Sequence, residues 1–133
     1  MLVNPVMTIF RILTWWCVIA LAVLSLLPAQ ELADLSLLPA LEMARTRLPP
    51  QLEHFLAYAG AAAIGMAGYG PSRGSSIRII GGLWLCAGIL EYLRHFSPGR
   101  HPSIEDFAAS ALGALCGGLA VALLRRRRFD QPG

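Results

Sequence analysis

Four long apolar runs dominate this chain of 133 residues. They cover about Ile9 to Leu27, His54 to Gly70, Ile77 to Leu93 and Ile104 to Leu124. Each run holds 17 to 21 residues, close to the ~20 that an α-helix needs to cross a hydrocarbon core of ~30 Å. Proline residues separate the runs, and no alternating strand pattern competes with a helical interpretation. The sequence therefore predicts an all-α fold: a single domain, residues 1–133, forming an integral membrane bundle of four transmembrane helices.

Composition favours the same class. Hydrophobic residues make up 56% of the chain and charged residues 14%, against roughly 25% charged in an average soluble protein. The pI near 9.1 raises the question of nucleic-acid binding, but the arginines form a cluster only at Arg125 to Arg128, directly after an apolar run. Such a cluster is typical of a cytoplasmic stop signal that contacts anionic lipid. We expect membrane lipids as partners, no nucleic acid, and a membrane-protein partner or a homo-oligomer as a further option.

The arginine distribution predicts the orientation. With four spans, both termini share one side of the membrane with the connection between the second and third spans. That side carries seven arginines: Arg11, Arg73, Arg78 and Arg125 to Arg128. The other side carries four: Arg45, Arg47, Arg94 and Arg100. Because cytoplasmic loops carry the excess of positive charge, both termini are expected in the cytoplasm.

The first run could instead be a cleaved signal peptide. Ala29 offers a small residue at a cleavage position, but Leu27 fits the small-x-small rule poorly and the leader carries only Arg11. We expect the run to be retained as a span. The following segment, residues 28–52, is too polar to span and too apolar for a free loop. We expect an interfacial amphipathic segment over the outer face, with a plain tether as the alternative.

The three cysteines, Cys17, Cys86 and Cys116, all fall inside apolar runs. Their number is odd, and no CxxC or Cys/His spacing occurs. We interpret them as small buried apolar side chains. Neither a disulfide framework nor a structural zinc site is expected, and no cofactor is implied.

Stripes of small residues mark one face of three runs. They are His54, Tyr58, Ala61 and Gly65; Gly81, Trp84, Gly88 and Glu91; and Asp106, Ser110, Gly113 and Gly117. Small residues let transmembrane helices approach closely, and we favour contacts within one chain over contacts between two chains. Each stripe ends in a titratable group on the same side of the membrane. We therefore expect His54, Glu91 and Asp106 to converge at the outer mouth of the bundle.

Glu91 needs a cationic partner, because the dipole disfavours an acid near the C-terminal end of a helix. Arg94, His95 and Arg100 are the candidates. The loop from Ser97 to Ser103 is expected to fold over the site, with Gly99 allowing a tight turn.

Three motifs resemble the VanZ-like family of small bacterial membrane proteins. They are HFLAYAG (His54 to Gly60), EYLRHFSPGR (Glu91 to Arg100) and DFAASALG (Asp106 to Gly113), and the resemblance covers about Leu48 to Gly118. The resemblance implies a multi-pass protein of the bacterial cytoplasmic (inner) membrane. It also implies an association, through the founding member of the family, with resistance to the glycopeptide teicoplanin.

The chain departs from the family pattern at three places. Pro50 and Gln51 replace the Asp-Lys pair that commonly precedes the histidine, Arg94 replaces a glutamine, and Ser110 replaces a common asparagine. These changes remove neutral hydrogen-bonding side chains and add a charge, so the ligand of a relative does not transfer in detail.

Three functions remain open for the outer site. The first is binding of a lipid head group or envelope precursor, with Arg94, Arg100 and His54 holding a phosphate. The second is an enzyme acting on an envelope lipid or glycan, with His54, Glu91 and Asp106 as catalytic candidates or, less simply, as ligands of a metal. The third is a structural ion-pair network in a partner subunit of a membrane complex. The candidate ligand-binding residues are His54, Tyr58, Glu91, Arg94, Arg100, Asp106 and Ser110.

Overall fold

The computed structural model describes residues 4–28, 31, 49–70 and 72–129. Within these ranges four α-helices follow one another: α1 (Pro5–Leu26), α4 (Pro50–Tyr69), α5 (Arg73–Leu93) and α6 (Ile104–Phe129). A short 3-10 helix, η2 (Arg94–Phe96), continues α5. This part of the chain contains no strand. The predicted all-α class is confirmed.

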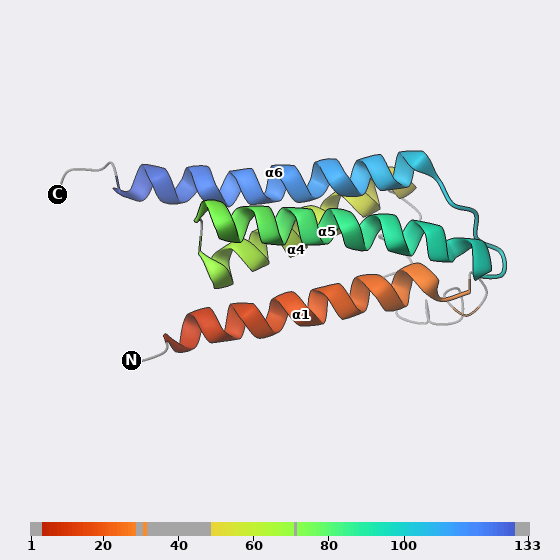
Figure 1. The fold of residues 1–133 in the computed structure, drawn as a ribbon, viewed down its shortest axis with the longest axis horizontal. Coiled ribbons are helices and arrows are strands. Elements are labelled where there is room, and N and C mark those ends of the chain that lie inside the picture. Colours follow the sequence, from red (N-terminus) through yellow and green to blue (C-terminus); the bar gives the residue numbers. More distant parts are fainter. Residues whose placement is uncertain (1–3, 29–30, 32–48, 71, 130–133) are drawn as a thin grey trace.

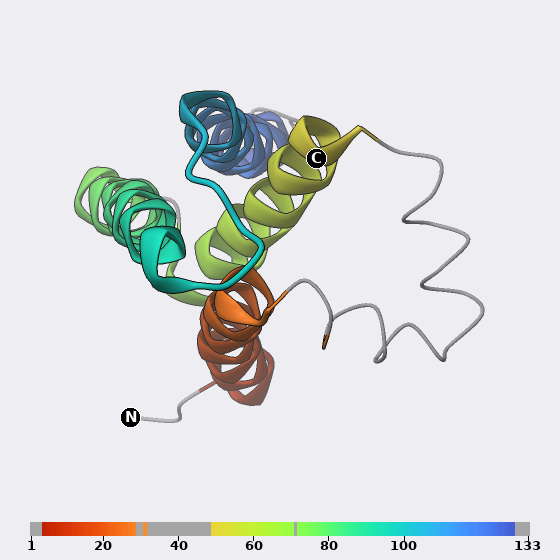
Figure 2. The same ribbon diagram turned by 90° about the vertical axis from the view of Figure 1, so that its right-hand side faces the viewer.

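The four helices run alternately in opposite directions along the long axis of the molecule (Figure 1). The start of α1 and the end of α6 lie together at one end, which we call the proximal end. The opposite, distal end holds the last turn of α1, the first turn of α4, η2 and the first turn of α6. Viewed from the distal end, α4 crosses obliquely between α6 and α1 (Figure 2).

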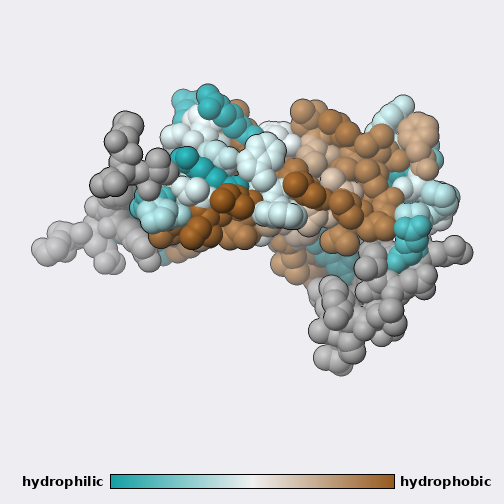
Figure 3. Space-filling view, turned by 90° about the horizontal axis from the view of Figure 1, so that it is seen from below, coloured by the Kyte–Doolittle hydropathy of each residue, from teal (hydrophilic) through white to brown (hydrophobic). Residues whose placement is uncertain are grey.

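Three helical stretches are long and apolar enough to cross a membrane. They are Pro5–Leu26, Arg73–Phe96 and Ile104–Arg127. Apolar residues cover much of the side of the bundle in Figure 3, and hydrophilic residues gather toward its two ends. Together these features indicate a multi-pass membrane protein. The fourth predicted span, α4, is not among the three, since Gln51, Glu53 and His54 lie in its first turns.

Helix α4 is the most buried helix of the described bundle. Its buried positions are Tyr58, Ala61, Ala62, Gly65, Met66 and Gly68, whereas α1 has none. Because α4 packs against its neighbours on several sides, it needs small side chains more than long apolar ones. The small side chains of α4 are therefore a consequence of its central place.

The two glycines of the α6 GxxxG pair lie directly on the backbone of α4. A Cβ atom at Gly113 would overlap the carbonyl of Phe55, and one at Gly117 would overlap the carbonyl of Ala59. Glycine is required at both positions because no side-chain atom fits between the two helices. The stripe therefore serves a contact within one chain, as expected.

The expected stripe on α5 is wrong at Gly81, which is exposed and whose added Cβ would meet nothing within 4 Å. The buried line of α5 runs instead through Leu83, Ala87 and Leu90. These three side chains fill the core, while the exposed Trp84 indole lies at the edge and faces α6, where its Nε1 donates a 2.9 Å hydrogen bond to the Ala111 carbonyl. One helical turn after Leu90, the same face carries Arg94. This charged residue is therefore buried.

Helix α1 is tied to the proximal end of α4. Arg11 Nε donates a 3.1 Å hydrogen bond to the carbonyl of Gly68, and the Arg11 guanidinium lies 5.1 Å from the centre of the Tyr69 ring. Trp15 Nε1 donates to the Tyr69 hydroxyl at 3.2 Å. These contacts join the first run to the proximal end of α4.

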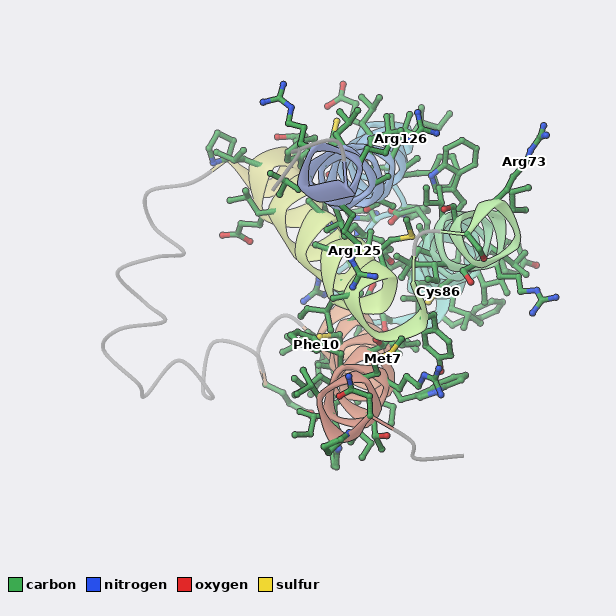
Figure 4. The ribbon with its side chains drawn as sticks, turned by 90° about the vertical axis from the view of Figure 1, so that its left-hand side faces the viewer. Met7, Phe10, Arg73, Cys86, Arg125 and Arg126 are labelled. Carbon is green, nitrogen blue, oxygen red and sulfur yellow. The ribbon has the colours of Figure 1, made fainter. Side chains whose placement is uncertain are left out.

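A second arginine reaches the same helix end from α6. Arg125 Nη2 donates a 2.9 Å hydrogen bond to the Ala67 carbonyl. Figure 4 shows Arg125 directed toward α4, while Arg73 and Arg126 point away from the bundle. Cations at the carboxyl end of α4 compensate its dipole and its unpaired carbonyls.

Two further expectations have mixed outcomes. The three cysteines are free, but Cys116 is exposed, while Cys17 and Cys86 are half-buried. Most of the expected interfacial segment, residues 28–52, lies outside the described residues.

The close contact between α4 and α6 yields the first prediction. Gly117→Ala should lower the free energy of unfolding by about 1–3 kcal/mol, the usual cost of forcing an extra carbon into a packed interface. Gly82→Ala is the matched control, since a Cβ at Gly82 meets nothing within 4 Å. Unfolding in mixed detergent micelles measures both. Equal stability of the two variants would contradict the packing described here.

Candidate functional site

Arg94 lies at the centre of a group of side chains at the distal end. The residue is only 4% exposed. Its Nη1 donates to Asp106 Oδ2 at 2.9 Å and to Glu91 Oε1 at 3.1 Å, and its Nη2 lies 3.0 Å from His54 Nε2. These four side chains, together with Ser110, are called the Arg94 cluster below. The cluster joins α4, α5, η2 and α6, so the predicted convergence of His54, Glu91 and Asp106 is observed.

The hydrogen bonds fix the protonation of His54. A guanidinium can only donate, so Nε2 is the accepting nitrogen and the ring proton lies on Nδ1. Nδ1 faces Ser110 Oγ at 3.4 Å. Ser110 donates its own proton to the Asp106 carbonyl at 2.8 Å, which leaves its lone pairs for the imidazole. In this arrangement His54 is neutral.

Glu91 connects the cluster to the loop before α6. Its Oε1 accepts a 2.6 Å hydrogen bond from the Ser103 backbone N–H as well as the bond from Arg94. Ser103 Oγ in turn accepts from the Asp106 N–H at 3.4 Å, capping the first turn of α6. Glu91 accepts both hydrogen bonds at the same atom, Oε1. No group in the described part of the chain donates to Oε2, which leaves one carboxylate oxygen available.

The cluster carries an excess of negative charge. One arginine faces two carboxylates, and the side chains of Arg94, Glu91 and Asp106 are 5%, 14% and 13% exposed. Burying charges is costly unless they are paired, and the single guanidinium pairs with both acids. Arg94 Nε is also buried and has no partner within the described residues.

The position that a metal ion would take is filled by the guanidinium of Arg94. It lies among the three side chains that were candidate ligands, His54, Glu91 and Asp106. Among the described residues no three His, Cys, Asp or Glu side chains are placed to hold a metal. The arrangement therefore does not fit the metal hypothesis.

Arg100 lies outside the cluster and contacts the end of α1. Its Nε donates to the Leu27 carbonyl at 3.0 Å and its Nη2 to the Leu24 carbonyl at 3.2 Å. Ser97 Oγ donates to the Leu26 carbonyl at 2.6 Å. The loop thus supplies donors to the unpaired carbonyls of a helix end. Gly99, with φ of 74°, makes the expected turn.

Tyr58 is also separate from the cluster. It is 3% exposed and belongs to the hydrophobic core. Its small-residue stripe predicted the burial, but burial in the core removes it from the set that can reach a ligand. Five of the seven predicted site residues therefore come together.

Ser103 is the site residue that the sequence reasoning missed. Its backbone N–H orients Glu91 and its hydroxyl caps α6. The signal was present, since Ser103 precedes the acidic Asp106 by three residues just before an apolar run, which is the pattern of a helix start.

A pocket of about 330 Å³ opens beside the cluster, between the distal parts of α5 and α6. Its lining residues are Gly88, Glu91, Tyr92, His95, Pro102, Ser103, Ile104 and Phe107. Glu91 is the member of the Arg94 cluster that reaches this pocket. The pocket gives the otherwise buried cluster an accessible side.

Comparison of the chain with protein-family models, with curated proteins and with solved structures gives no match in any of the three. The VanZ-like resemblance remains a prediction that rests on the three motifs, and the geometry of the site carries the functional argument.

Proposed function

We propose that this chain is a VanZ-like multi-pass protein of the bacterial cytoplasmic membrane that binds the head group of a membrane lipid or lipid-linked envelope precursor. The observation that supports the proposal is the Glu91 carboxylate. One of its oxygens is held by Arg94 and Ser103, and the side chain lines a pocket between two helices that are able to span a membrane.

The charge of the cluster favours a head group that donates hydrogen bonds. Both terminal nitrogens of Arg94 are engaged inside the protein, and Arg100 donates to α1 carbonyls. A phosphate in the pocket would meet the Glu91 carboxylate and no guanidinium, since neither Arg94 nor Arg100 lines the pocket. An amine or a sugar hydroxyl, in contrast, donates to a carboxylate with favourable charge. We therefore favour recognition of hydroxyl or amine groups over recognition of a phosphate.

The proposal includes four crossings with both termini in the cytoplasm. Helix α4 has 20 residues, which at 1.5 Å per residue span about 30 Å, and it lies alongside three helices apolar enough to cross. Among the polar residues of its first turns, His54 belongs to the Arg94 cluster and Gln51 Nε2 donates to Glu105 Oε2 at 3.4 Å. The distal end, with Glu53, Glu91, Glu105 and Asp106, then faces outward.

Labelling of single cysteines tests this orientation. In a background without the native cysteines, Pro98→Cys at the distal loop should react with a membrane-impermeant maleimide in spheroplasts. Ser72→Cys, before α5 at the proximal end, should react only after the membrane is permeabilised. Both positions are exposed, so burial does not confuse the comparison. The reverse pattern would overturn the orientation.

Native mass spectrometry tests head-group binding. Wild type, Glu91→Gln and the control Glu105→Gln would be extracted from bacterial membranes in a mild detergent. The Glu91→Gln side chain keeps an oxygen for Arg94 and Ser103 but replaces the second oxygen with an amide nitrogen, so bound lipid should fall about tenfold, the equivalent of about 1.4 kcal/mol. Glu105 is an exposed acid in the first turn of α6, also at the distal end, and it does not line the pocket, so its variant should retain the lipid. Equal occupancy in all three proteins, or none in wild type, contradicts the proposal.

We also propose a link to teicoplanin resistance, which is the association of the family that the chain resembles. Expression of wild type in a susceptible host should raise the teicoplanin concentration that stops growth, and expression of Glu91→Gln should not. The absence of any difference between wild type and an empty vector would remove the resistance role while leaving lipid binding in place.

A structural role in a membrane complex is the second candidate function, because Arg94 bonds to groups on three different helices. A partner subunit needs a rigid distal end but no accessible carboxylate. If Glu91→Gln lowers stability in detergent and leaves bound lipid unchanged, this second candidate is the better account.

A further inference from the structure

The pocket beside Glu91 has an apolar body and a polar end. Tyr92 and Phe107 contribute rings from α5 and α6, and Ile104 contributes an aliphatic side chain. Glu91 and Ser103 form the polar end next to the Arg94 cluster. An open surface pocket of this kind fits an amphiphile, with its polar part at the carboxylate and its apolar part along the rings.

The surroundings of the pocket are those of a membrane interface. Tyr92 and Phe96 are 66% and 73% exposed, and their rings meet edge to face with centroids 6.1 Å apart. His95 lies beside Tyr92, with ring centroids 6.3 Å apart. An exposed tyrosine at the end of a helix that is able to span a membrane is typical of the boundary between head groups and chains. The pocket therefore lies where the head and the chain of a lipid meet.

We propose that the pocket holds the upper part of one hydrocarbon chain of the lipid whose head group contacts Glu91. This inference rests on the proposed function and adds where the chain lies: between the distal parts of α5 and α6. The two helices that form the walls are both able to span a membrane, so a lipid chain reaches the pocket from the side without crossing water.

Gly88 provides the space for this chain. It lines the pocket one turn before Tyr92 and Glu91, and a Cβ added there would lie 3.7 Å from Phe107 Cε2, an ordinary contact. A larger side chain at Gly88 would extend into the pocket without touching the backbone of a neighbouring helix. Gly82 offers a matched position on the same helix, since nothing lies within 4 Å of its added Cβ.

Photocrosslinking tests the proposal. Wild type, Gly88→Leu and Gly82→Leu would be reconstituted into nanodiscs containing a phosphatidylethanolamine with a diazirine in the upper part of one chain. After irradiation, mass spectrometry of peptides locates the adducts. We expect wild-type adducts on Tyr92, Ile104 and Phe107, a loss of at least fivefold in Gly88→Leu, and no loss in Gly82→Leu.

Two results would overturn the pocket assignment: adducts spread over α1 and the remaining lipid-facing surface, or pocket adducts that persist in Gly88→Leu. The wild-type adduct map requires no variant, so the test stands even where Gly88→Leu folds poorly. Failure of the chain site is distinct from failure of the proposed function. In the first case Glu91→Gln still loses co-purified lipid, whereas in the second wild type and Glu91→Gln carry the same amount.

Discussion

The distal end of this bundle depends on one buried cation, Arg94, placed between two carboxylates. In a water-poor environment a charge that loses its partner is strongly destabilising, even where the pair itself contributes little net stability. The guanidinium therefore constrains the positions of Glu91 on α5 and Asp106 on α6, while its other nitrogen orients His54 on α4. Ser103 and Ser110 add hydrogen bonds that connect these side chains to the first turns of α6: Ser103 N–H donates to Glu91, and Ser110 Oγ donates to the Asp106 carbonyl.

Close packing of α4 against α6 brings these groups within reach of one another. Gly113 and Gly117 let the two backbones touch. Ser110 and Asp106 lie on the same face of α6, nearer its start, and this packing places them next to His54. The same packing explains the small side chains of α4, since a helix surrounded by other helices is selected for them.

Local spacing made much of this arrangement predictable. The apolar runs predicted the helices, the stripes on α4 and α6 predicted the facing surfaces, and the dipole argument predicted a cation for Glu91. The face of α5 was not predictable in this way, because its glycines suggested a close contact while Leu83, Ala87 and Leu90 fill the core. Arg94 was named as one partner of Glu91, but its contact with Asp106 joins residues 12 apart across a loop. The role of Arg100 depends on the place of α1, which no motif encodes.

The coupling between Arg94 and Asp106 tests this account most directly. A double-mutant cycle with Arg94→Met, Asp106→Asn and the combined variant would be measured by unfolding in mixed micelles. The account predicts that Asp106→Asn lowers the free energy of unfolding much less in the Arg94→Met protein than in wild type. The expected coupling free energy is about 1–3 kcal/mol, as for residues in direct contact. The exposed Arg126→Met, combined with Asp106→Asn, should be additive. Additive effects in the Arg94 cycle, within about 0.5 kcal/mol, would contradict the central place of this ion pair.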